Sequence, residues 1–309
     1  MASGRPAATV SVDVDPVDLH LLGYGVGDAP PDARVYEKAL PRLRKHLQAA
    51  GIRATFFVVA RDAARFQGPL ADLVAAGHEV ASHSLGHPAD FARKSKDEVR
   101  KELESSREAL EAALGRSVVG FRAPGWEWPP DLPAQLAEAG YRYDASLLPS
   151  PALGLARAVL FLRSARGRGL PDLGMGQWWA PREPHTLAAA EPSGSRALRE
   201  FPVSVTRVLR VPVYHTLRYG IGAVRFGSVL DRLARSGHPL SYALHAVDVL
   251  GLHEDGVDPR MQRHPGMRRS LDEKLALLDE TLAAVQARFD ARPFAERLGR
   301  EPNSATRCA

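Results

Sequence analysis

The fold is decided by a pattern that is clearest at Ala49-Ala50-Gly51-Ile52-Arg53-Ala54-Thr55-Phe56-Phe57-Val58-Val59. An amphipathic segment ends at a glycine, and a short run of β-branched and aromatic residues follows. Glycine is common after a helix because it has no side chain to clash at positive φ. The same arrangement recurs at Gly77, Gly140 and Gly237. Helices that alternate with short strands predict an α/β fold with parallel strands joined by crossover helices.

Two longer segments have the 3.6-residue period of amphipathic helices, which we interpret as core stripes. Their apolar or small positions are Val99, Leu103, Ser106, Leu110 and Leu114 in one segment, and Leu271, Leu275, Leu278, Leu282 and Val285 in the other. The chain has 309 residues, 45% of them hydrophobic, and no Pro/Ser/Gly-rich linker divides it. We therefore expect one domain over residues 1–297, with a variable region at 149–236 and a disordered tail at 298–309.

The charge and the cysteine content exclude several classes of protein. The net charge of +5 suits an anionic substrate, a phosphate-bearing carrier or an acidic membrane surface. The arginines are scattered rather than clustered in a stripe, so we expect no nucleic-acid binding. The single cysteine, Cys308, excludes a disulfide framework and a thiolate metal site. Without an apolar signal core or a membrane span, we expect a cytoplasmic protein, with peripheral contact at the inner membrane face as a further possibility.

Acidic and imidazole side chains follow three of the predicted strands: Asp13 and Asp15, then His83 and His87, then His245. His83 and His87 are four residues apart, so a helical turn or a tight loop would put both rings on one side. Two imidazoles and one carboxylate form an open metal face, which is typical of a catalytic site. One aspartate could bind the metal while the other takes a proton from metal-bound water, and these residues alone leave open which does which.

Arg122 and Asp144 also follow predicted strands. In a parallel α/β barrel the chemistry occurs at the C-terminal ends of the strands, so we expect both near the site, although they could instead form a structural ion pair. The remaining histidines lack ligand spacing, and we expect them to face solvent or to have structural partners. They are His20, His46, His78, His185, His215, His238, His253 and His264, with His20 and His253 the foremost candidates for a role.

Five segments resemble, in order, the motifs of the polysaccharide deacetylases, also known as NodB-homology proteins or family 4 carbohydrate esterases. They are Asp13-Val14-Asp15, His83-Ser84-x-x-His87, Arg122-Ala123-Pro124, Asp144-Ala145-Ser146-Leu147 and Leu244-His245. The resemblance spans about residues 8 to 250. It implies a distorted (β/α) barrel of the NodB-homology type, with an inserted helical or loop region before the last motif strand.

The resemblance also implies a role for each motif residue. Asp13 would be the catalytic base, and Arg122 would orient and tune it. Asp144 would pair with His245, the general acid that protonates the leaving amine. The metal ligands would be Asp15, His83 and His87, with zinc as the default ion and cobalt, nickel, iron or manganese also compatible with them.

Two departures from the family pattern concern the substrate. Val14 separates two aspartates that are usually adjacent, a variant of the branch that includes peptidoglycan-deacetylase-like and cyclic-amide-hydrolysing members. Gly125 replaces the usual tyrosine after the third motif, so an oxyanion contact there could come only from its backbone N–H. Trp126 and Trp128 could stack on a sugar face or an acyl chain, or could simply pack as part of a lid. With Leu244, these residues are the expected substrate contacts.

The region from Pro149 to Ser236 is longer than barrel closure requires, and we expect it to set specificity. Its first part, residues 151–168, combines apolar residues with arginines and contains no acidic residue. Such a segment can lie at a membrane interface or bind a phosphate-linked lipid, or it can pack on the barrel and expose its arginines. The segments 177–179 and 207–212 continue the apolar and basic character.

The sequence therefore predicts a metal-dependent hydrolase that removes an N-acyl group, most often N-acetyl in this family, from an amino sugar. The substrate could be a lipid-linked sugar or glycolipid. The alternatives are hydrolysis of a small linear or cyclic amide, such as an imide or ureide, and a non-catalytic binding protein on the same fold.

Overall fold

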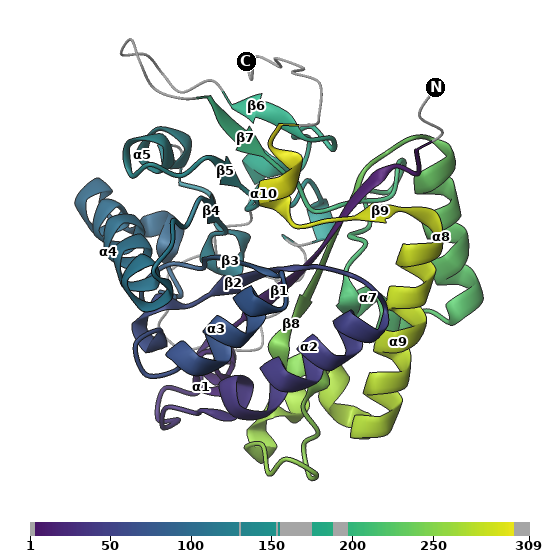
Figure 1. Ribbon diagram of the computed structural model, residues 1–309, viewed down its shortest axis with the longest axis horizontal. Coiled ribbons are helices and arrows are strands. Elements are labelled where there is room, and N and C mark those ends of the chain that lie inside the picture. The colour runs from purple at the N-terminus through teal and green to yellow at the C-terminus, as the bar shows by residue number, and fades with distance from the viewer. Residues whose placement is uncertain (1–3, 130, 153, 155–174, 188–196, 300–309) are drawn as a thin grey trace. The chain divides into compact units, whose positions relative to one another are not determined.

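The computed structural model describes residues 4–129, 131–152, 154, 175–187 and 197–299 (Figure 1). Most of the basic segment 151–168, most of the predicted tail and Cys308 lie outside these residues. The chain divides into two compact units. The first comprises residues 1–57, 66–80 and 213–293, and the second comprises 58–65, 81–212 and 294–309. The expectation of one domain over residues 1–297 stays a prediction.

The first unit contains strands at its start and end, with helices between them. Its helices and strands are β1 (Ala7–Val14), α1 (Val17–Gly23), a π-helix (Val35–Ala39), α2 (Leu40–Ala49), α3 (Gln67–Ala75), α7 (His215–Gly220), α8 (Ala223–Arg235), β8 (Leu240–His245), 3₁₀-helices (Ala246–Val249, Pro259–Arg263, Pro265–Arg268), α9 (Leu271–Arg288) and β9 (Asp290–Ala291). Strands β2 (Thr55–Val58) and β3 (Glu79–Ser82) contribute residues to both units.

Strand β1 is the centre of the first unit. It pairs in parallel with β8, from Ala8 opposite Leu240 to Asp13 opposite His245, and its first residues pair with β9 (Figure 1). Both faces of the strand are buried, as expected for a parallel strand covered on each side. This register fixes the ends of β1 and β8 side by side, and both ends carry residues of the predicted site.

Helix α9 confirms one predicted core stripe and adds a charged residue to it. Ser270 and Glu273 form a capping box that starts the helix. Leu278, Leu282 and Val285 are buried as predicted, Leu271 and Leu275 are only half-buried, and Lys274 is buried as well. Its ammonium group donates hydrogen bonds to the carbonyls of Val247 and Leu250, which are the partners that a buried cation requires.

The second unit contains a small mixed sheet in the order β3-β4-β5-β7-β6, parallel except for the antiparallel pair β6–β7. Its further elements are α4 (Lys96–Leu114), β4 (Gly120–Phe121), α5 (Leu132–Glu138), β5 (Tyr143–Asp144), β6 (His185–Leu187), β7 (Leu198–Glu200), α10 (Phe294–Arg297) and 3₁₀-helices (Ala60–Asp62, Phe91–Arg93, Pro124–Trp126, Met175–Gln177).

Helix α4 confirms four of the five positions of the other predicted stripe, because Val99, Leu103, Ser106 and Leu110 are buried, whereas Leu114 is half-buried. The helix starts with a capping box formed by Ser95 and Glu98, and it ends at Gly115 in the left-handed conformation.

The predicted glycine caps are also confirmed. Gly51, Gly77, Gly140 and Gly237 have φ between +65° and +83°, where a side chain would be strained. At Gly140 the guanidinium of Arg107 occupies the space as well, with Nη1 only 2.1 Å from the position of a Cβ atom.

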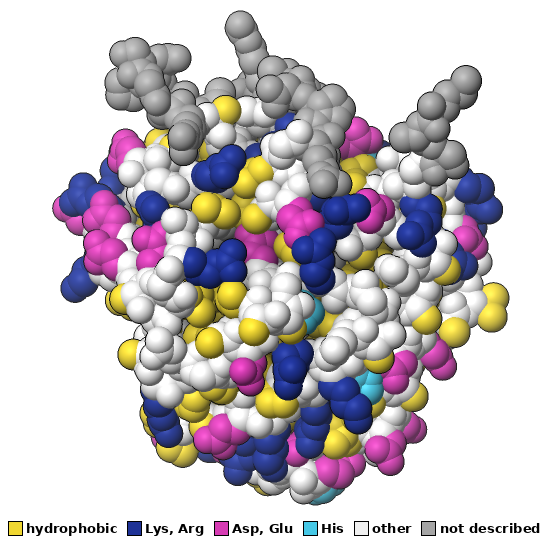
Figure 2. Space-filling model, in the orientation of Figure 1, with side chains coloured by type: hydrophobic (Ala, Val, Ile, Leu, Met, Phe, Trp, Pro, Cys, Tyr) yellow, Lys and Arg dark blue, Asp and Glu magenta, His cyan; other side chains and the backbone are white. Residues whose placement is uncertain are grey.

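The surface seen in Figure 2 mixes lysine and arginine with aspartate and glutamate rather than forming a basic stripe. None of the described helices is both long and apolar enough to cross a membrane.

Candidate functional site

In the first unit, the end of β1 places Asp13 opposite His245 on β8. The Asp13 Oδ2 atom lies 3.9 Å from His245 Nε2, and the Asp13 side chain is almost fully buried. Asp15 follows two residues later, also buried, with its Oδ2 atom 3.9 Å from Nε2 of His20 on α1. Asp13 and Asp15 thus have different imidazole neighbours, so the two aspartates can have separate roles.

His20 brings a further imidazole to this part of the first unit. Its ring centroid lies 5.3 Å from that of His245 and 5.9 Å from that of His264. The sequence had set His20 apart together with His253, but His253 is exposed. His264 is buried, and burial lowers its pKa to about 4, so it is neutral near pH 7.

Asp248 organises the backbone around His245. Its carboxylate accepts a hydrogen bond from the His245 backbone N–H at 2.8 Å and another from the Tyr219 hydroxyl at 2.8 Å. Burial alone would raise the pKa of Asp248, but its electrostatic interactions with the imidazoles of His215 and His264 and with the Lys274 ammonium bring the pKa below its usual range. Sequence reasoning missed this residue. The available signal was an aspartate three residues after a strand-end histidine, a spacing that closes a tight turn.

In the second unit, the loop after β3 holds His83 and His87 together. Their ring centroids are 5.0 Å apart, as expected if a tight loop puts both rings on one side. Ser84 and His87 both have positive φ, and the His87 N–H bonds the Ser84 hydroxyl oxygen. Because non-glycine residues rarely adopt this conformation, the surrounding hydrogen bonds must hold the loop in place.

Glu102 on α4 supplies part of that support. One of its carboxylate oxygens, Oε2, accepts the backbone N–H groups of both Leu85 and Gly86 at 2.9 Å. The carbonyl oxygens of Ser84 and Leu85 accept the N–H groups of residues 60 and 61. Glu102 therefore acts as an anchor for the histidine loop, which sequence reasoning did not identify.

The hydrogen bond of His83 defines which of its ring nitrogens can bind a metal. Nδ1 lies 2.7 Å from the Arg122 carbonyl oxygen, which can only accept a hydrogen bond. Nδ1 therefore carries the hydrogen, and Nε2 keeps a lone pair, as in imidazoles whose second nitrogen fixes the tautomer. His83 and His87 thus offer two imidazole nitrogens of the second unit to a metal ion, and nitrogen donors of this kind fit zinc and similar divalent ions.

Arg122 and Asp144 are both buried in the second unit. Arg122 Nε donates to the carbonyl of Ala145 at 3.0 Å. Asp144 accepts hydrogen bonds from Ala145 N–H and the Ser146 hydroxyl, and its partner in strand register is Glu200. Glu200 was not identified from the sequence. The predicted pairing of Asp144 with His245 stays a prediction.

The expected substrate contacts have different environments. Gly125 is exposed, with φ of +59°, and Trp126 is half-buried against Leu148, Val203 and Val205. Trp128 is half-buried. Leu244, by contrast, is buried within β8, so its side chain belongs to the core of the first unit.

Comparison with known proteins relates part of this chain to one family. Residues 27–143, which include His83, His87 and Arg122, match the model of a family described as polysaccharide deacetylase. A peptidoglycan deacetylase of Helicobacter pylori is 32% identical over 141 residues, which cover 44% of this chain and 48% of that protein. A chitooligosaccharide deacetylase of Sinorhizobium fredii is 37% identical over 89 residues, covering 29% of this chain and 41% of that protein. The chain thus spans less than half of these relatives.

A solved structure has a similar fold. A protein described as a putative polysaccharide deacetylase from Mycobacterium smegmatis aligns with 100% of this chain and 96% of its own, with a TM-score of 0.64 at 22% identity. The predicted α/β barrel class of the NodB-homology type is therefore confirmed.

Proposed function

Because residues 27–143 match the model of the polysaccharide deacetylase family, we propose that the protein is a metal-dependent hydrolase that removes an N-acetyl group from an amino sugar. The observation that carries the proposal is the hydrogen bond from His83 Nδ1 to the Arg122 carbonyl, which keeps Nε2 available for a metal beside His87. In the proposal Asp15 completes the ligand set, and the ion is zinc or a similar divalent metal.

A bound metal would polarise the acyl carbonyl and make the attacking water more acidic. Asp13 takes a proton from that water as it adds to the acyl carbon, and Arg122 orients the base. His245 donates a proton to the amide nitrogen as the carbon–nitrogen bond breaks, leaving acetate and a free amine. In support, Asp13 Oδ2 lies 3.9 Å from His245 Nε2, so base and acid are neighbours. Asp144 is proposed to tune this acid, as the family resemblance implies.

The proposed substrate contacts follow from the third and fifth motifs. The Gly125 N–H would stabilise the oxyanion, and Trp126 and Trp128 would stack on the sugar. Leu244, which is buried, would shape the site through its backbone rather than through its side chain.

Acetate and formate release from a substrate panel tests the proposal. The panel contains free N-acetyl sugars, lipid-linked sugars and cyclic imides, each incubated with zinc-loaded protein. Asp13→Asn should reduce acetate release by about 100-fold to 10,000-fold while the zinc content stays unchanged. The exposed Asp28 provides a matched control, because Asp28→Asn makes the same chemical change away from the site.

Other outcomes would contradict the proposal in distinct ways. Turnover of imides alone would make the protein a small-amide hydrolase. No release from any substrate, at full zinc occupancy, would favour a non-catalytic binding protein.

We further propose that the sugar is lipid-linked and that the protein contacts an anionic membrane surface. The support is an exposed apolar patch in the second unit, formed by Met175, Trp179, Val208 and Leu209, which are 63–83% exposed. Arg210 joins the two loops of this patch, because it donates to the carbonyls of residues 178 and 180 and lies over the Trp179 ring. Exposed apolar patches mark interaction surfaces, and tryptophan with arginine suits the headgroup region.

Sedimentation with vesicles of neutral or anionic phospholipid tests the membrane contact. Leu209→Ser should weaken binding to anionic vesicles by about 30-fold, because burial of one leucine contributes about 2 kcal/mol. Val224→Ser is the matched control, since Val224 is equally exposed but belongs to α8 in the first unit. Equal effects of the two substitutions, or no binding by the unsubstituted protein, would contradict the proposal. The cytoplasmic location predicted from the sequence stays a prediction.

A further inference from the structure

Two carboxyl side chains face each other at the end of the sheet in the second unit. Strands β5 and β7 are parallel, with Asp144 opposite Glu200 in register. Both side chains are fully buried. Glutamate and aspartate are almost never fully buried without a partner, so this pair requires a specific chemical explanation.

Each carboxyl group has one oxygen that accepts hydrogen bonds from the protein. Asp144 Oδ1 accepts from Ala145 N–H and the Ser146 hydroxyl, and Glu200 Oε1 accepts from Leu147 N–H at 3.1 Å. The other two oxygens, Asp144 Oδ2 and Glu200 Oε2, are buried and receive no N–H or O–H within the described part of the chain. The register places the two residues side by side on neighbouring strands, so a hydrogen bond between the two carboxyl groups would satisfy these oxygens.

A hydrogen bond between two carboxyl groups requires a proton on one of them. If both were ionised, each would present only acceptor atoms to the other, and two negative charges would be buried in contact. Arg122 is the cation that faces both groups. One shared proton leaves a single negative charge on the pair, which balances the single positive charge of the buried guanidinium.

We propose that Asp144 and Glu200 share one proton at neutral pH, and that Glu200 is a positioning residue that holds Asp144 and Arg122 in place. The proton sharing follows from the geometry of the second unit alone. Only the consequence for catalysis rests on the proposed function, in which Arg122 orients the base.

The electrostatics of the pair agree with a shared proton. Burial raises the pKa of Asp144 to about 7 and raises that of Glu200 above its usual range, and Arg122 offsets only part of this effect. On the other side of β7, His185 of β6 is the register partner of Glu200. Burial lowers the pKa of His185, so this imidazole is neutral and adds no charge to the pair.

Proton release on unfolding provides the direct test. Both carboxyl groups ionise in the unfolded chain at pH 6, so unfolding in lightly buffered urea should release the shared proton. The protein should release about one proton more than Glu200→Gln, because the amide of glutamine can donate to Asp144 Oδ2 without a titrating proton. Glu138→Gln, at an exposed position on α5, makes the same change and should release as many protons as the unsubstituted protein. Equal release by the unsubstituted protein and Glu200→Gln would overturn the proposal.

A second measurement keeps the inference testable if a variant is unstable. Asp144→Asn and Glu200→Gln each keep a donor between the two side chains, so each should shift the urea midpoint little. The double variant removes the negative charge that the pair presents to Arg122, and it should lower the midpoint by more than the sum of the two single shifts. If the midpoint shift of the double variant equals the sum of the two single shifts, the proposal that the two carboxyl groups share one charge is overturned.

The pH profile of acetate release tests the positioning role. Glu200→Gln should shift the profile relative to Glu138→Gln, and an unshifted profile would overturn that role. If the unsubstituted protein releases no acetate, the proposed function fails, but the proton count still decides whether the pair shares a proton.

Discussion

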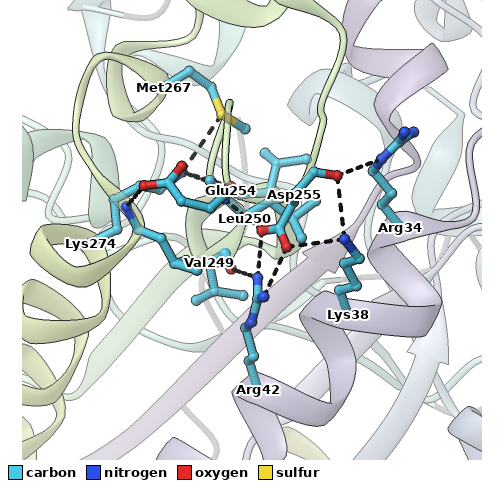
Figure 3. Close-up of polar contacts among 12 residues, drawn as sticks. Arg34, Lys38, Arg42, Val249, Leu250, Glu254, Asp255, Met267 and Lys274 are labelled. Carbon is cyan, nitrogen blue, oxygen red and sulfur yellow. Dashed lines mark hydrogen bonds and ion pairs between the residues drawn. The ribbon is translucent and has the colours of Figure 1, made fainter.

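Asp255 links the loop after β8 to helix α2 through ion pairs and hydrogen bonds (Figure 3). Replacement of Asp255 should therefore lower the free energy of unfolding. Arg42 donates to both carboxylate oxygens at 2.6 and 2.8 Å, and the Gly251 N–H donates to one of them at 2.8 Å. Lys38 Nζ lies 3.3 Å from the other oxygen. The carboxylate is nearly inaccessible to water, so replacing Asp255 with asparagine removes a buried charge and leaves the bidentate partner unmatched.

The pKa of Asp255 gives the magnitude. Burial would raise it, but the hydrogen bonds from Arg42 and Gly251, together with the charge of Arg42, lower it from 3.8 to about 2. At about 1.4 kcal/mol per unit, the ionised carboxylate stabilises the fold by about 2 kcal/mol. Arg42 and Lys38 are partly exposed, so salt should reduce this value. Because the pKa is lowered, the stabilisation is complete above pH 3.8 and is lost as the pH falls through about 2.

Urea unfolding of the protein and Asp255→Asn at pH 7 and pH 3 tests this reasoning. The two free energies of unfolding should differ by about 2 kcal/mol at pH 7 and by about 1 kcal/mol at pH 3. Asp231→Asn is the matched control, because Asp231 also pairs with an arginine but is 40% exposed. Exposed ion pairs contribute little, so this control should lose much less stability.

Two results would refute the argument. Equal destabilisation by Asp255→Asn and Asp231→Asn would mean that burial does not strengthen the pair. A difference that stays constant between pH 7 and pH 3 would mean that the charge of Asp255 is not its source.

Three further predictions concern the helices and the loop that they support. Glu102→Ala removes the acceptor of the Leu85 and Gly86 N–H groups, so the affinity for zinc, measured by titration calorimetry, should fall by about 10-fold to 100-fold. Glu104→Ala, on the exposed face of α4, should leave the affinity for zinc unchanged. Ser95→Ala breaks the capping box of α4 and should lower the urea unfolding free energy by about 1 kcal/mol, whereas Ser105→Ala inside the helix should not. Gly140→Ala should lower the free energy of unfolding by about 1 kcal/mol more than Gly237→Ala, as measured by thermal unfolding. Gly140 and Gly237 both have positive φ, but only Gly140 is in contact with Arg107. Equal losses of stability would mean that the Arg107 side chain moves away freely.

Local sequence patterns predicted the local structure well, for physical reasons. The glycine caps at Gly51 and Gly140 follow from sterics that act on one residue, so the prediction needs no knowledge of the rest of the chain. The four-residue spacing of His83 and His87 predicted neighbouring rings for the same reason, since only a short loop separates them. The buried Lys274 was missed because a periodicity argument counts lysine as polar. The carbonyls that accept its hydrogen bonds come from another element.

Residues that act through long-range pairing could not be identified in this way. Glu200 meets Asp144 only because β5 and β7 pair in parallel, and a pattern read along the chain contains no information about that register. Asp248 is close to His245 in the sequence. Its importance depends on Tyr219, His215 and His264, which come from other segments.

Buried carboxylates in this protein differ in charge because of their partners, and this difference supports the assignment of roles. Asp248 is buried as fully as Asp144, yet imidazoles and a lysine face it, and its pKa falls below the usual range. Asp144 faces a second carboxyl group, and burial raises its pKa to about 7. Burial raises the pKa of both carboxyl groups, and what decides which of them can carry a proton near neutral pH is whether the neighbouring groups outweigh that effect. On this argument Asp248 serves as a fixed negative charge behind His245, whereas the Asp144 and Glu200 pair can exchange a proton in the pH range in which a deacetylase would operate.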